Sequence, residues 1–228
     1  MKSKQFAVIG LGQFGEAIAR SLSNKGAQVM AIDIKPERVE YISSEVTYAV
    51  ALDATDKKAL ASQNIQEFDA VVIAIGEDFE SLLLCAVNLI ELKCPRIIAR
   101  AKADANKLIL ERLGIKEIFQ PEEEVGTVVA ERLINPYVLS YMSMPDNYAI
   151  AEIKPPKDII NKRLDEIKIL ENYKINLITI KREPLINKEK DTAHIIGVPQ
   201  RDTVIKEEDR LIIFGHEKDF TKFIEVNN

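Results

Sequence analysis

Short apolar runs alternate with amphipathic segments over the first 120 residues of the chain. The apolar runs predict strands at 5–10, 27–33, 46–52, 68–75, 96–101 and 116–119. The segments between them predict helices over about 13–25, 36–44, 56–63, 79–92 and 104–113. The run from Ala70 to Ile75 is apolar at every position, which is typical of a parallel strand covered by helices on both sides. The pattern therefore predicts an α/β fold with a Rossmann-like doubly wound parallel sheet.

The pattern changes after Pro121. Residues 123–143 predict one helix, which Pro136 would kink or divide. Further on, the sequence predicts a small α+β domain with strands at 148–153, 175–181, 193–197 and 210–214 and helices near 158–172 and 217–225. We therefore expect an N-terminal domain over 1–122, a connecting helix over 123–145 and a C-terminal domain over 146–228.

A glycine motif follows the first predicted strand and opens the first predicted helix. Gly10 would permit the tight turn, Gly12 the approach of a pyrophosphate, and Gly15 close packing of the helix on the strand. The phosphates would face the free amides at the start of the helix. Asp33 ends the next strand, where it would accept hydrogen bonds from a ribose and repel a 2′-phosphate. This part of the chain is predicted to bind an adenine nucleotide, and Asp33 argues against NADP.

Composition narrows the class of protein. A net charge of −5 provides no basic surface for nucleic acid, so no such partner is expected. The two cysteines, Cys85 and Cys94, lie in apolar or helical context and are interpreted as buried reduced thiols of a cytoplasmic protein. The start of the chain leads directly into a strand, and no apolar run approaches the ~18 residues that a membrane span needs. We therefore expect neither a signal peptide nor a membrane span.

Candidate catalytic groups are scarce. A dehydrogenase needs a proton donor or acceptor beside the carbon that exchanges hydride. The two histidines, His194 and His216, both fall in the predicted C-terminal domain, and the sequence has no Ser-His-Asp set or Cys-x-x-Cys pattern. These observations favour a nucleotide sensor without enzymatic activity. The alternative is a small NAD-dependent oxidoreductase whose second domain binds the substrate.

Several segments together resemble one known family. They are the glycine motif from Gly10 to Gly15, Asp33, Asp53-Ala54-Thr55, Ala74-Ile75-Gly76 and the stretch from Leu113 to Glu122. In this order they resemble RCK proteins, especially the cytosolic regulatory subunits of Ktr and Trk potassium uptake systems. The resemblance implies a TrkA-N type domain, a crossover helix and a TrkA-C type domain. It also implies dimers that assemble into an octameric ring on the inner face of the cell membrane. There the ring would gate a membrane-embedded potassium-translocating partner in response to ATP, ADP or NAD(H).

The resemblance also implies roles for particular residues. The glycine loop with Gln13 and Phe14 would hold phosphates, Asp33 would hold the ribose, and Lys35 would lie beside them. The remaining contacts would come from Asp53, Ala54 and Thr55 on the adenine side, Ile75 and Gly76 on the cleft floor, and Arg100 facing phosphate. Glu122 would reach the terminal phosphate of a neighbouring subunit's nucleotide, directly or through Mg²⁺ or Ca²⁺. The alternative is that Glu122 has no ligand and is only a carboxylate at the start of a helix.

Two departures from the family pattern bear on ligand choice. Ktr-type motifs often place Arg where this chain has Gln13, which leaves the choice among ATP, ADP and NAD(H) open unless Arg100 supplies the charge. Ile175 and Asn176 match the pattern of relatives that bind cyclic di-AMP in the C-terminal domain, whereas Leu170 stands where those relatives carry Arg. Cyclic di-AMP is therefore a candidate second ligand. The alternative is that Ile175 and Asn176 only begin a strand.

Overall fold

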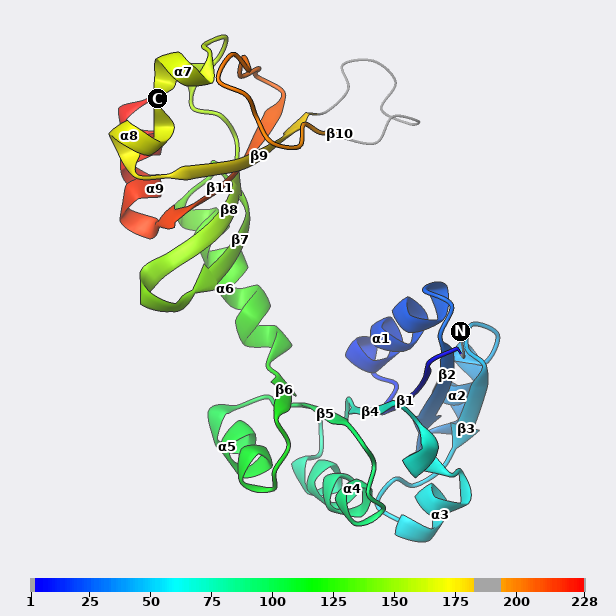
Figure 1. Cartoon of the computed structure of the whole chain (residues 1–228). Helices are drawn as coiled ribbons and strands as arrows, with labels where there is room; N and C mark the ends of the chain where they lie inside the picture. Colours follow the sequence, from blue (N-terminus) through cyan, green and yellow to red (C-terminus); the bar gives the residue numbers. More distant parts are fainter. Residues whose placement is uncertain (1–2, 183–193, 228) are drawn as a thin grey trace. The chain divides into compact units, whose positions relative to one another are not determined.

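The computed structural model describes residues 3–182 and 194–227, and the chain divides into two compact units, Met1–Glu122 and Glu123–Asn228 (Figure 1). Each unit has its own sheet and its own apolar core. Within the described residues, no helix is both long and apolar enough to cross a membrane.

The first unit is the doubly wound sheet that the sequence predicts. Its strands are β1 (Gln5–Ile9), β2 (Gln28–Asp33), β3 (Tyr48–Ala51), β4 (Ala70–Ile73), β5 (Ile97–Arg100) and β6 (Glu117–Phe119). Its helices are α1 (Gln13–Asn24), α2 (Pro36–Ile42), α3 (Lys57–Ser62), η1 (Ile65–Glu67), α4 (Phe79–Glu91) and α5 (Asp104–Arg112). All strands pair in parallel in the order β3-β2-β1-β4-β5-β6. The predicted fold class is thus confirmed.

The core explains this arrangement. Alternate residues of β1 point to opposite faces of the sheet, so Ala7 and Ile9 join one apolar cluster and Val8 joins another. Helices α3, α4 and α5 contribute to the first cluster, and α1 and α2 to the second. The strand order reverses between β1 and β4, and in such sheets ligands bind beyond the carboxyl ends of the strands at this reversal.

The second unit is built on an antiparallel sheet. Helix α6 (Pro121–Ile134) leads into it, followed by β7 (Val138–Met144), η2 (Pro145–Asn147) and β8 (Tyr148–Ile153). The chain continues through η3 (Lys157–Ile159), α7 (Leu164–Ile167), α8 (Ile169–Tyr173), β9 (Asn176–Arg182), β10 (His194–Ile195), β11 (Asp209–His216) and α9 (Glu217–Val226). The strand order is β10-β9-β11-β8-β7.

Two helix predictions in this half of the chain are wrong. The helix predicted over 123–143 and extended to 145 as a connecting segment ends at Ile134, because Pro136 disfavours helical backbone at the residue before it. Residues 138–144 instead form β7, which pairs with β8. The helix predicted near 158–172 is three short helices, interrupted by left-handed backbone at Asn161 and Lys168. Of the strand predicted at 193–197, β10 covers 194–195, and residue 193 lies outside the described residues.

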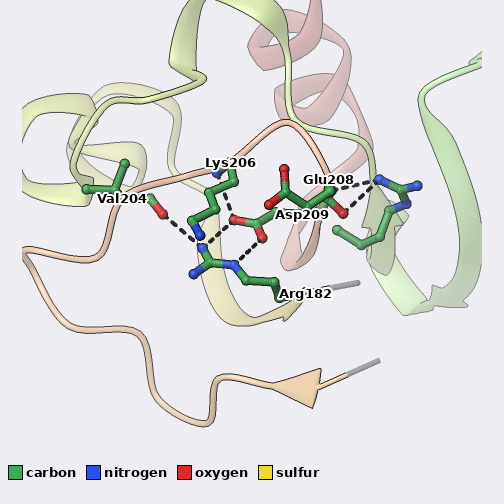
Figure 2. A network of polar contacts seen from close by, with 6 residues as sticks. Arg182, Val204, Lys206, Glu208 and Asp209 are labelled. Atoms are coloured by element: carbon green, nitrogen blue, oxygen red, sulfur yellow. Dashed lines mark hydrogen bonds and ion pairs between the residues drawn. The ribbon is translucent and has the colours of Figure 1, made fainter. Parts of the chain in front are cut away.

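An ion pair between the partly buried Arg182 and the fully buried Asp209 joins β9 to β11, as Figure 2 shows. The guanidinium of Arg182 donates through Nε and Nη2 to the two carboxylate oxygens of Asp209, over 2.7 and 2.8 Å. Asp209 is fully buried and also accepts from the backbone N–H of Lys206 at 2.8 Å, while Arg182 reaches the carbonyl of Val204. The hydrogen bond to Asp209 raises the pKa of Arg182. The pair fixes the register of the two strands at this end of the sheet.

Candidate functional site

Two of the three motif glycines are required by packing. Gly10 has a φ of +93°, and a Cβ there would lie 2.9 Å from the backbone nitrogen of Ile75. A Cβ on Gly15 would overlap the carbonyl oxygen of Gly10 and lie 3.0 Å from the Cβ of Ala74. These glycines let the loop after β1 and the start of α1 pack against the end of β4.

Gly12 has a different role. Its backbone is extended, with φ of −73° and ψ of −179°, and a Cβ there would meet no atom within 4 Å. Gly12 is the N-cap residue of α1, and no side chain caps this end of the helix. Because the first N–H groups of a helix lack acceptors within it, open space at such an end suits an anion. The residues therefore fit a phosphate group at this point.

Asp33 holds the glycine loop in place. It is only 5% exposed, and its Oδ2 accepts a hydrogen bond from the backbone N–H of Leu11 at 2.7 Å. Its Oδ1 accepts from the N–H of Lys35 at 2.9 Å, and Arg38 Nη1 lies 3.4 Å from Oδ2. An ionised carboxylate has about four acceptor positions, so capacity for a ribose hydroxyl remains. Sequence reasoning missed Arg38, which comes from the first turn of α2.

The turn after β3 is also at this edge of the sheet. Asp53 Oδ1 accepts hydrogen bonds from the Thr55 backbone N–H at 2.9 Å and from the Thr55 hydroxyl at 2.7 Å. Ala54 is buried, and Asn88 of α4 donates to the carbonyl of Thr55 at 2.9 Å. The Leu52 N–H bonds to the carbonyl of Asp33 at 3.0 Å. The turn is thus tied both to the end of β2 and to α4.

Arg100 lies on the other side of the loop. Its guanidinium carbon is 5.4 Å from the ring centroid of Phe14, and it forms an ion pair with Glu122 at the start of α6. The hydrogen bond from Arg100 holds the pKa of the Glu122 carboxyl below its usual value. A Cβ on Gly76 would lie 2.6 Å from Arg100 Nη1 and 3.4 Å from the Cε of Lys102. Gly76 therefore admits two basic side chains, of which Lys102 was not predicted.

The structure brings the predicted residues of the first unit to one edge of its sheet. The glycine loop follows β1, Asp33 ends β2, and the turns beginning at Asp53 and Ile75 follow β3 and β4. Arg100 ends β5, and Glu122 lies in the first turn of α6. Because the strands are parallel, these are all carboxyl ends.

The residues considered for cyclic di-AMP lie in the second unit. Ile175 is fully buried, and its side chain belongs to the apolar core of that unit. Asn176 begins β9 and is exposed, as is Leu170 on α8. Only Asn176 of the predicted pair therefore presents its side chain at the surface.

The two histidines lie apart from the glycine loop in the sequence and belong to the second unit. His194 is exposed in β10, and His216 accepts a hydrogen bond at Nδ1 from the N–H of Lys218 at 3.3 Å, which caps α9. Over residues 3–182 and 194–227, no group of three His, Cys, Asp or Glu side chains could hold a metal ion. Both histidines lie in the second unit, as the sequence predicts.

Comparison with known proteins identifies the family. The TrkA-N domain matches residues 6–121, and the TrkA-C domain matches residues 148–227. The Ktr system potassium uptake protein A of Bacillus subtilis (strain 168) is 33% identical over 223 residues, which are 98% of this chain and 96% of that protein.

Two solved structures are similar in fold. The GsuK RCK domain matches with a TM-score of 0.65 and 15% identity, over 100% of this chain and 48% of that chain. The NAD(P)-binding domain of an exopolyphosphatase-related protein from Archaeoglobus fulgidus matches with a TM-score of 0.51 and 26% identity, over 57% of this chain and 96% of that domain. With both domain matches and a full-length relative, the resemblance read from the sequence is confirmed: this chain belongs to the RCK family of TrkA-N and TrkA-C domain proteins, to which the Ktr potassium uptake proteins belong.

Proposed function

We propose that this protein is a nucleotide-sensing regulatory subunit of a potassium uptake system and that it gates a membrane-embedded potassium-translocating partner. The support is the identity of 33% to a Ktr potassium uptake protein over nearly the whole of both chains. On this proposal it works in the cytoplasm, attached to the inner face of the cell membrane through that partner. Two relatives that are 33% identical over nearly their whole length are Ktr potassium uptake proteins, so this protein is not an enzyme. The alternative of a small NAD-dependent oxidoreductase is therefore excluded.

The open space at Gly12 is the observation that carries nucleotide binding. It adjoins an uncapped helix end, and Asp33 lies within hydrogen-bond reach of the same loop. The likeness to an NAD(P)-binding domain at 26% identity adds support. ATP, ADP or NAD(H) would bind with phosphates at Gly10 to Gly15, ribose at Asp33 with Lys35 nearby, and adenine beside Asp53, Ala54 and Thr55. Ile75 and Gly76 would form the cleft floor.

Arg100 would supply the positive charge that binds the outer phosphates. It would replace the arginine that Ktr-type motifs often carry at the position of Gln13. Arg100 is mostly buried, and Phe14 and Gly76 flank its guanidinium. Glu122 would reach the terminal phosphate of a neighbouring subunit's nucleotide through Mg²⁺ or Ca²⁺, because a carboxylate and a phosphate repel each other unless a cation intervenes. Replacing Glu122 by Gln should then remove the cation dependence of ATP binding, as calorimetry with and without Mg²⁺ would measure.

Assembly into a ring would use α6. The helix has no buried residue, and Val125, Val129 and Leu133 recur at every fourth position with exposed fractions of 60, 47 and 78%. An apolar stripe of this kind on a helix marks an interaction surface. We propose dimers that assemble into an octameric ring, which is the assembly that the family resemblance implies.

Cyclic di-AMP is a candidate second ligand of the C-terminal domain. Asn176 would contact it at the surface, while Ile175 would support Asn176 from the core. Titration of the protein with cyclic di-AMP tests this proposal, and an Asn176→Ala variant that binds as tightly as the parent would count against it.

The function is tested by binding. Calorimetry with ATP, ADP and NADH should detect at least one of them in the parent protein. Absence of binding of all three at millimolar concentration would refute the nucleotide-sensing proposal.

A further inference from the structure

The ion pair between Arg100 and Glu122 joins the predicted phosphate site to the helix that leaves the first unit. Arg100 ends β5, and Glu122 lies in the first turn of α6. Both residues belong to the first unit, so a single subunit makes this contact. Glu122 therefore has a partner within its own subunit.

The two partners differ in how firmly they are held. The Arg100 side chain is 16% exposed, it lies over the ring of Phe14, and Gly76 leaves room for its Nη1. The Glu122 side chain is 54% exposed, and the side chain that it pairs with is Arg100. The guanidinium is thus fixed in place, while the carboxylate can move into water at little cost.

The guanidinium is incompletely hydrogen-bonded within the part of the chain that the structure describes. Its Nε is buried and has no hydrogen-bond partner among the described residues. Lys102 lies on the same side of Gly76 and adds a second positive charge, which also lowers the pKa of Glu122. One exposed carboxylate therefore faces two basic side chains, next to the loop where phosphates would bind.

We propose that Glu122 is an internal competitor of the nucleotide: it pairs with Arg100 when no phosphate reaches that guanidinium, and the phosphates of a bound nucleotide displace it. Glu122 thereby sets how strongly affinity depends on the number of phosphates. This inference rests on the proposed nucleotide binding. It also links that binding to α6, because the displaced carboxylate belongs to the first turn of the helix. Once released, Glu122 is available for the contact with a neighbouring subunit's nucleotide.

Competition predicts the direction in which affinity changes when the charge of Glu122 is removed. If Glu122 instead only strengthened nucleotide binding, the change would have the opposite direction. Without divalent cations, removing the charge of Glu122 should strengthen binding of ligands whose phosphates reach Arg100. The pair is partly exposed, so the effect should be about two- to fivefold in the dissociation constant, toward the upper limit for exposed ion pairs. Adenosine has no phosphate, and its affinity should not change.

The experiment is calorimetry in EDTA with adenosine, ADP and ATP. The full-length parent, Glu122→Gln and Arg100→Gln are compared with the double variant and with Glu123→Gln. Glu123→Gln is the matched control, because it removes the same charge from the adjacent exposed position. Glu122→Gln should tighten ADP and ATP but leave adenosine unchanged, and Glu123→Gln should have little effect. In the Arg100→Gln background, ADP and ATP should bind more weakly and the Glu122→Gln change should have no further effect.

The outcomes separate the two proposals. If the parent binds neither ADP nor ATP, the competition fails; the nucleotide-sensing function fails with it only if the parent also does not bind NADH. If the parent binds ADP but Glu122→Gln binds it no more tightly than Glu123→Gln does, the competition is refuted and the function stands. Tightening that persists without Arg100 would also refute the competition, since it would come from general electrostatics.

Discussion

At the residue scale, the three glycines of one motif have separate physical roles. Gly10 and Gly15 are fixed by contacts within the protein, whereas the space beside Gly12 is open. The motif could be found in the sequence because its spacing follows from the strand, turn and helix around it. Arg38 and Lys102 could not be found in this way, because neither belongs to a local motif and both approach the site through tertiary packing.

The Gly12→Val variant should fold like the parent and lose nucleotide binding. Its backbone is in the extended region that any residue adopts, and its Cβ would meet no protein atom, so the side chain would occupy only the space of the phosphates. Calorimetry with ADP should show at least a ~100-fold loss, which is about 2.7 kcal/mol.

The contrasting variant is Gly15→Ala. Its Cβ would overlap the Gly10 backbone, so urea unfolding should show a loss of roughly 1–3 kcal/mol. If Gly12→Val binds ADP as well as the parent does, the phosphates do not lie at Gly12.

At the element scale, the sequence predicts the first unit well and the second unit less well. The strands of the first unit are apolar throughout, and caps such as Asp78, which accepts hydrogen bonds from the Glu80 and Ser81 N–H groups, mark its helices. In β7, the residues Val138, Leu139 and Tyr141 have a spacing that a helix also shows, and the choice of strand depends on pairing with β8. The left-handed residue Lys168, which separates α7 from α8, is not a glycine and left no signal.

The ion pair between β9 and β11 should be a major support of the second unit. Replacing Arg182 by Met leaves the fully buried Asp209 without its charged partner, which should cost about 3–5 kcal/mol in the free energy of unfolding. The matched control is Lys181→Met on the same strand, whose partly exposed pair with Glu152 spans 3.2 Å and should contribute under about 1 kcal/mol. Equal losses in the free energy of unfolding in the two variants, measured by urea unfolding, would show that the pair of Arg182 and Asp209 stabilises the unit no more than the partly exposed pair does.

At the scale of the whole molecule, the apolar stripe of α6 carries the argument for assembly. A Val129→Glu substitution would place a charge in the middle of the stripe, while Thr127→Glu, an exposed position on the opposite face of the same helix, is the control. Light scattering should give a multiple of the protomer mass for the parent and for Thr127→Glu, and a smaller species for Val129→Glu. A parent that is monomeric at micromolar concentration would contradict the proposed ring.

Nucleotide sensing requires that the binding free energy of the nucleotide differ between two shapes of the protein. A nucleotide shifts an equilibrium between two shapes only as far as its affinities for the two shapes differ. A tenfold preference supplies about 1.4 kcal/mol per site, and several sites in one assembly would add to a shift large enough to switch a partner. In the proposed assembly, a nucleotide site at Gly12, Asp33 and Arg100 in every subunit would meet this requirement through the number of sites as well as through their affinity.

The central claim is tested most directly by ion flux. Vesicles that contain the membrane partner with this protein bound are loaded with ATP or with ADP, and uptake of potassium or rubidium is measured. The account predicts that the rate changes when ATP replaces ADP, and that the difference disappears with Gly12→Val. Equal uptake with both nucleotides, in a parent protein that calorimetry shows to bind them, would contradict it.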